Sequence, residues 1–216
     1  MLGEVTITLL QGFGKTLELF ALTLLFALPL GLLICFGSMS RVKILSAIIN
    51  AIIWVIRGTP LMLQLLVIYY GPGIVSHQQI GFTNSTRFLA ALIAFVINYA
   101  CYFAVIYRGG IQSVPVGQRE AGKVLGMTNS QIFRKIVFLQ VIKNIIPPIS
   151  NEIITLVKDT SLARVIAVYE IIWAGETYIK HGGLIWPLFY TGVFYLLFSA
   201  LLTWIFNKTE KKLAYF

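Results

Sequence analysis

Charge is scarce in this chain of 216 residues: only 12% of them are Asp, Glu, Lys or Arg, whereas 58% are hydrophobic. The surface of a soluble domain carries far more charge, so the composition excludes an ordinary soluble protein and favours an integral membrane protein. Acidic residues are the scarcest charged residues, with 8 against 17 basic ones. In a soluble protein this excess would suggest nucleic-acid binding, but the cytoplasmic loops of membrane proteins also collect Lys and Arg.

Cysteine is also nearly absent. Cys35 and Cys101 both fall in apolar runs, which indicates buried free thiols rather than a disulfide or a metal site. His77 and His181 fall in predicted outer loops, where surface positions or contacts to a binding protein are expected rather than metal ligands. The N-terminus has no basic cluster and the first apolar run is too long for a signal-peptide core, so no cleaved signal is predicted.

Long apolar runs make up most of what remains. A transmembrane helix needs about 20 apolar residues, and the sequence predicts an all-α transmembrane protein with about five spans. Residues 44–52 fit an interfacial helix, and Arg57 is expected near the cytoplasmic end of the second span, where its side chain could snorkel to the interface. The predicted spans cover approximately residues 17–36, 53–73, 88–107, 145–172 and 184–206.

The basic residues are distributed unevenly between the predicted loops. Successive loops between spans lie on alternate sides of the membrane. Eleven of the 17 basic residues fall in the loops of one side, three fall in the loops of the other side, and three lie within spans. The positive-inside rule therefore places the N-terminus outside and the C-terminus inside. This asymmetry explains the basic balance of the chain without nucleic acid as a partner.

The most basic segment, residues 108–143, does not resemble a span. Gly126 follows a short helix predicted over 120–125, at a position where a left-handed residue ends a helix at low cost. Thr128 and Gln131 then have capping-box spacing, and Ile132 and Ile136 have helical spacing. The segment is predicted to be an ordered cytoplasmic helix–turn–helix, although periodicity alone would equally allow a solvated connector.

The fourth span carries charge at an unusual depth. Glu152 and Asp159 are seven residues apart, with Thr155 or Leu156 between them, so one helix face presents both carboxylates. A charge at the bilayer centre costs roughly 2.5–3.5 kcal/mol on insertion scales. Internal pairing of Asp159 with Lys158 or Arg164 could meet this cost, whereas Glu152 has no basic neighbour one turn away on its face.

A buried anion is what a cationic amino acid needs for its ammonium or guanidinium group. Thr160 and Ser161 are expected to begin a second half-helix after a break at Asp159, with free N–H groups that could bind a carboxylate. Asn98 and Gln64 are polar at similar depth and could bind substrate or join helices by hydrogen bonds. The candidate substrate-binding residues are Glu152, Asp159, Asn98, Ser161, Thr160, Gln64 and Thr155; no catalytic residue is expected.

Several motifs then resemble one known family. Glu120-Ala121-Gly122, three residues, Gly126, nine residues and Ile136 resemble the EAA loop in permease subunits of bacterial ABC importers, although Gly122, Phe138 and Leu139 stand where that pattern has Ala, Leu and Pro. Further segments resemble its polar-amino-acid branch, which is related to the histidine and glutamine systems. These segments are RGTPL at 57–61, RGGIQSVP at 108–115 and KDTSL at 158–162.

The resemblance implies a single transmembrane permease domain over 1–216 with the type I importer fold, in the bacterial inner membrane and surrounded by lipid. The 108–143 loop would hold a coupling helix that docks on a separate ATPase. Two ATPase subunits would bind ATP and Mg, this chain itself having no cofactor, and a second identical or homologous permease and an extracytoplasmic binding protein would complete the complex. The coupling residues implied are Arg119, Glu120, Ala121, Gly122, Lys123 and Gly126.

The expected function is import of polar, in particular cationic, L-amino acids such as arginine, lysine and histidine by alternating access, with no bond chemistry in this chain. A glutamine, glutamate or cystine permease is the alternative within the family. An ion-coupled secondary carrier would use the same carboxylates as proton or sodium relays, but the inverted repeats that favour it are not visible in the sequence. A channel would give the ordered loop no role.

Overall fold

A computed structural model describes residues 2–76 and 83–213, and every regular element in these ranges is helical; His77 lies outside them. The predicted all-α architecture is therefore confirmed. Two segments are not α-helical: η1 is a π-helix and η2 is a 3₁₀-helix. The elements are α1 (Leu2–Ser38), α2 (Lys43–Gly58), α3 (Leu61–Ser76), α4 (Asn84–Gln112), α5 (Val116–Val124), α6 (Asn129–Ile132), η1 (Phe133–Val137), α7 (Phe138–Asp159), η2 (Thr160–Ile166), α8 (Ile171–Gly182) and α9 (Trp186–Leu213).

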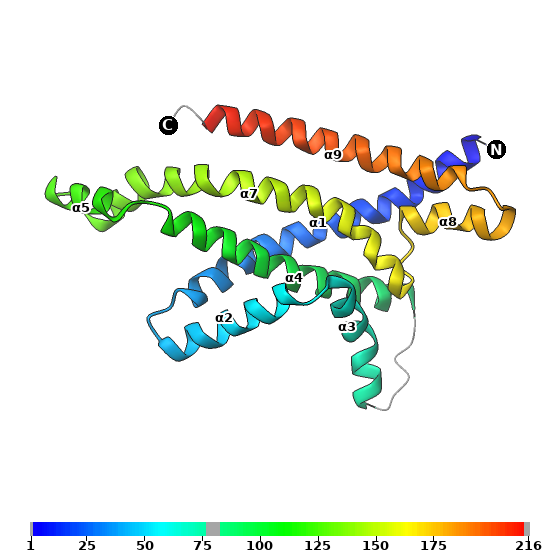
Figure 1. The fold of residues 1–216 in the computed structure, drawn as a ribbon, viewed down its shortest axis with the longest axis horizontal. Helices are drawn as coiled ribbons and strands as arrows, with labels where there is room; N and C mark the ends of the chain where they lie inside the picture. The colour runs from blue at the N-terminus through cyan, green and yellow to red at the C-terminus, as the bar shows by residue number, and fades with distance from the viewer. Residues whose placement is uncertain (1, 77–82, 214–216) are drawn as a thin grey trace.

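The long helices α1, α4, α7 and α9 extend along the molecule, with the short helix α5 at one end and α8 at the other (Figure 1). The N-terminus lies at the α8 end and the C-terminus at the α5 end. Termini at opposite ends are what the odd number of crossings expected from the sequence would produce. Which end faces the cytoplasm stays a prediction from the charge distribution.

Small residues let α1 and α4 pack closely. A Cβ atom on Gly31 would lie 2.8 Å from Cβ of Phe103 and 2.9 Å from the carbonyl oxygen of Ala100, so only glycine fits at this crossing. Ala100 and Ala104 are fully buried on the α4 side. Close approach through small residues is how membrane helices gain dispersion contacts where lipid removes the hydrophobic driving force between them.

Three described helices, α1, α4 and α9, are long and apolar enough to cross a membrane, and the bent pair α2–α3 raises the number to up to four. The charged helix α7 is not among them, but with 22 residues it is about 33 Å long and lies alongside α4 and α9 (Figure 1). Counting α7 gives the five spans expected from the sequence, and that number stays a prediction.

The second predicted span is wrong in its bounds. Residues 44–52 do not form a separate interfacial helix, because α2 runs without interruption from Lys43 to Gly58. The chain then bends by 105° before α3, at Pro60, which has no N–H to continue a helix. Helix α2 has 16 residues and is about 24 Å long. Arg57, in its last turn, therefore lies at the opposite end of the helix from Lys43.

The fourth predicted span, 145–172, also differs in its bounds, because α7 begins at Phe138 and ends at Asp159. The structure shows no break at Asp159, whose φ and ψ are helical, and the N–H of Thr160 is bonded to carbonyl oxygens of α7. The free half-helix N-terminus predicted at Thr160 and Ser161 is therefore absent. The chain instead tightens into η2 and turns at Ala167, whose φ of 57° is left-handed, before α8 begins.

Candidate functional site

A cavity of about 560 Å³ lies where the end of α2 meets the middle of α4 and the end of α7. This volume is in the range that holds a small-molecule ligand. Its chemistry is mixed, with two carboxylates, one guanidinium, an amide, hydroxyls and two aromatic rings. The lining residues are Arg57, Gly58, Thr59, Pro60, Leu61, Asn98, Tyr99, Tyr102, Glu152, Thr155, Asp159 and Leu162.

One face of α7 supplies Glu152, Thr155 and Asp159 to this cavity. The spacing of three and four residues aligns them along the helix. Of the two residues considered between the carboxylates, Thr155 lines the cavity, whereas Leu156 is fully buried in the apolar core. The structure thus brings both carboxylates together, as their spacing in the sequence indicated.

Asp159 is held by a tyrosine rather than by a cation. The Tyr99 hydroxyl donates a hydrogen bond of 2.7 Å to Oδ2 of Asp159, and Tyr99 is only 2% exposed, stacked parallel to Phe95. Within the described residues, no ion pair includes Asp159 or Glu152, and Arg164 pairs with Glu176 instead. The pairing of Asp159 with Lys158 or Arg164 that would make it purely structural is therefore not seen.

Arg57 is the site residue that the sequence interpretation misplaced. It lines the cavity from the last turn of α2, and its guanidinium carbon lies 4.9 Å from the centre of the Tyr102 ring. The guanidinium therefore lies over an aromatic face at the cavity, a role that the sequence interpretation did not assign to it. The Gly-Thr-Pro run directly after Arg57 could have indicated this position. These residues predict the end of a helix, so Arg57 is expected in the last turn, beside the break.

Asn98 and Gln64 are joined directly: Asn98 Nδ2 donates to Gln64 Oε1 at 3.0 Å. Asn98 is 5% exposed and lines the cavity, whereas Gln64 contacts Asn98 but does not line the cavity. Thr160 is fully buried and its hydroxyl donates to the Val157 carbonyl. Of the seven candidate residues, the cavity brings together Glu152, Thr155, Asp159 and Asn98, but not Gln64, Thr160 or Ser161.

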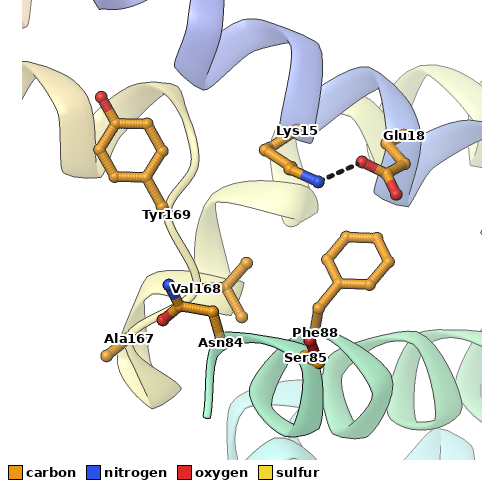
Figure 2. A pocket seen from close by; sticks show the side chains of 8 residues that line it. All are labelled: Lys15, Glu18, Asn84, Ser85, Phe88, Ala167, Val168 and Tyr169. Atoms are coloured by element: carbon orange, nitrogen blue, oxygen red, sulfur yellow. Dashed lines mark hydrogen bonds and ion pairs between the residues drawn. The ribbon is translucent and has the colours of Figure 1, made fainter.

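A second cavity, of about 450 Å³, lies beyond η2 between α1, the first turn of α4 and the turn that follows η2 (Figure 2). Lys15 and Glu18, both on α1, line this cavity and form an ion pair of 2.7 Å. The ammonium of Lys15 lies 5.5 Å from the centre of the Phe88 ring. Both charged side chains are exposed and already neutralise each other. This cavity therefore offers a ligand less unpaired charge than the one beside Asp159.

Within 108–143, residues 108–112 continue α4 and residues 138–143 begin α7. The residues between them have the predicted helix–turn–helix form, but the first short helix begins at Val116 rather than at Glu120. Helix α5 ends one residue before Leu125, and Gly126 has a φ of 73°. Thr128 and Gln131 form the predicted capping box, with both reciprocal hydrogen bonds present. A Cβ atom on Gly122 would lie 2.8 Å from Cγ1 of Ile132, so glycine at this position lets α5 pack directly on the following helix.

The outer side of α5 is uncovered. Val124 and Leu125 are 87% and 79% exposed, which is unusual for apolar residues outside a span and marks a contact surface. Arg119, Glu120 and Lys123 line a groove of about 610 Å³ between α5 and the adjacent ends of α1 and α4, while Ala121 is exposed and Gly122 is buried. The structure therefore presents α5 as a short protruding helix at the end of the molecule (Figure 1).

Comparison with known proteins places these features in context. Residues 27–215 match the family model described as "Binding-protein-dependent transport system inner membrane component". The chain is 32% identical over 215 residues to the L-cystine transport system permease protein TcyL of Bacillus subtilis (strain 168), covering 99% of this chain and 90% of that protein. It is also 32% identical over 209 residues to the arginine transport system permease protein ArtQ of the same organism, covering 95% and 92%.

Solved structures agree with the sequence relatives. A crystal structure of an amino acid ABC transporter with histidines superposes with a TM-score of 0.87 at 30% identity, covering 98% of this chain and 96% of that chain. The inward-facing MetNI methionine ABC transporter has a TM-score of 0.66 at 17% identity, and this similarity shows the fold alone.

Proposed function

The chain belongs to the family of inner membrane components of binding-protein-dependent transport systems, and from this premise we propose that it carries cationic L-amino acids across the membrane. It is the permease subunit of an amino-acid ABC importer, with the type I importer fold, and it is not an enzyme. Relatives named for cystine, arginine and glutamine are similarly close to it. The substrate must therefore be argued from the site.

The charge balance of the 560 Å³ cavity supports a cationic substrate. A dibasic L-amino acid such as arginine carries two cationic groups and one carboxylate. The cavity offers the complement: Glu152 and Asp159 as anions and Arg57 as the cation. A neutral amino acid would leave one half-buried carboxylate without a cationic partner from the ligand, whereas a dibasic one would pair with both.

The residues suggest a division of labour. Arg57 presents a planar fork that suits a carboxylate, so it would bind the α-carboxylate. Asp159 keeps Oδ1 available while Tyr99 occupies Oδ2, and it would bind one cationic group; Glu152, which has no ion-pair partner among the described residues, would bind the other. Thr155 and Asn98 would add hydrogen bonds from the lining.

Transport would follow alternating access. Two ATPase subunits would bind ATP and Mg. One of them would contact α5 of this chain, at the groove lined by Arg119, Glu120 and Lys123, and would transmit its closure to the spans. A second permease, identical or homologous, and an extracytoplasmic binding protein would complete the complex. The exposed Val124 and Leu125 at the end of α5 support a protein contact there.

A substrate panel tests this proposal directly. The complete complex, with its ATPase and binding protein, is reconstituted in proteoliposomes, and ATPase stimulation is measured with arginine, lysine, histidine, glutamine, glutamate and cystine. Stimulation by the dibasic amino acids at lower concentrations than by the others supports the proposal. Equal or stronger stimulation by glutamine or cystine would assign the chain to the alternative substrate classes, and uptake without any ATPase subunit would contradict ATP-driven import altogether.

A further inference from the structure

The break between α2 and α3 leaves backbone carbonyl groups at the end of α2 without helical partners. In a membrane such groups must be bonded within the protein. One side chain meets part of this need: Nε2 of Gln64 lies 2.7 Å from the Ile56 carbonyl oxygen, 2.8 Å from Oγ1 of Thr59 and 3.2 Å from the Thr59 carbonyl oxygen. The Thr59 hydroxyl in turn donates to the Val55 carbonyl at 2.9 Å.

The other end of the Gln64 amide points to α4. Its Oε1 accepts the 3.0 Å hydrogen bond from Asn98, so one side chain joins the end of α2, the first turn of α3 and the middle of α4. Both ends of the amide are used, with nitrogen donating and oxygen accepting. Neither a carboxylate nor an apolar side chain of the same shape can make both sets of bonds.

Gln64 does not line the cavity, but the helix end that it holds does. Arg57 lies one residue after Ile56 and two before Thr59, the residues that accept from Gln64. A shift of this helix end would move the Arg57 guanidinium away from Tyr102 and the cavity. A binding group must be held within a fraction of an ångström of its productive position. Replacing a residue that holds it there therefore changes ligand recognition.

We propose that Gln64 is a positioning residue for substrate selection: by capping α2 and tying it to Asn98, it holds the Arg57 guanidinium where the α-carboxylate of the substrate binds. The proposal rests on the proposed function, since it takes Arg57 as the carboxylate-binding group. A purely structural role predicts that loss of Gln64 weakens all ligands equally. A positioning role predicts a selective loss of carboxylate recognition.

The test compares two ligands that differ at the carboxylate alone. L-Arginine and L-argininamide share the ammonium and guanidinium groups, and their Kd values are measured by equilibrium binding to the permease–ATPase complex in nanodiscs without the binding protein. In the wild type, arginine is expected to bind about tenfold more tightly than argininamide, since a charge-assisted hydrogen bond is replaced by a weaker one. Gln64→Met should remove most of this preference while the Kd for argininamide changes less than about twofold.

Two variants make the outcome decisive. Gln11→Met, the same change at an exposed glutamine of α1 that lines neither cavity, should keep the wild-type preference. Gln64→Asn retains the amide but shortens its reach, and it should give an intermediate preference; it carries the test if Gln64→Met fails to assemble. An unchanged preference in both Gln64 variants would overturn the proposal.

Arg57→Gln separates this proposal from the function on which it rests. Loss of the preference in Arg57→Gln but not in the Gln64 variants refutes the positioning role and leaves the proposed function intact. An unchanged preference in Arg57→Gln would instead refute the assignment of Arg57 to the carboxylate.

Discussion

Replacing Glu152 with glutamine removes one negative charge from the cavity and keeps nearly the same side-chain size. No ion pair within the described residues includes Glu152, so the change breaks no direct ion pair in the protein. A hydrogen bond to a charged group contributes about 1.5–3 kcal/mol and a neutral one about 0.5–1.5 kcal/mol. The difference of about 1–1.5 kcal/mol corresponds to roughly 5- to 13-fold weaker binding of arginine or lysine.

The Kd of the ligand L-glutamine should change less than about twofold in this variant, because its single ammonium group can bind Asp159. Equilibrium binding of both amino acids to the nanodisc complex measures the two shifts separately. The matched control is Glu18→Gln, which makes the same chemical change in the second cavity (Figure 2), and it should leave both Kd values unchanged. If the two ligands shift in parallel in Glu152→Gln, or if Glu18→Gln produces the selective loss, the assignment of Glu152 is refuted.

Two further predictions concern the support of the site and the coupling loop. The destabilising effects of Tyr99→Phe and Asp159→Asn should not add in a double-mutant cycle, with thermal inactivation as the readout. Their shared hydrogen bond should give a coupling of about 1–2 kcal/mol. Additive effects would contradict that bond. Gly122→Val should overpack α5 at a cost of about 1–3 kcal/mol and reduce substrate-stimulated ATP hydrolysis without weakening arginine binding. Adding Ile132→Ala should restore stimulation, and a failure of this rescue would show that the contact is not the cause.

The local chemistry of the chain could be predicted where short-range rules decide it. The capping box at Thr128, the left-handed Gly126 and the shared helix face of Glu152 and Asp159 follow from spacing of three to seven residues. Each of these features depends on residues that lie within two turns of one another. Tertiary packing therefore has little opportunity to override them.

Features that depend on distant contacts were not predictable in the same way. The hydrogen bond from Tyr99 to Asp159 joins residues 60 apart in sequence, and the amide pair of Asn98 and Gln64 joins residues 34 apart. The position of Arg57 was wrong because hydropathy alone started the second span about ten residues late. Once α2 starts at Lys43, its rise of about 1.5 Å per residue carries Arg57 to the cavity.

The location of bound substrate tests the central claim most directly. A cryo-electron microscopy structure of the complete complex at saturating L-arginine should show the ligand in the cavity between Arg57, Glu152 and Asp159. Its α-carboxylate should face Arg57, and its two cationic groups should face the carboxylates. Arginine found beside Lys15 and Glu18 instead, or an empty cavity at α7 under these conditions, would contradict the account.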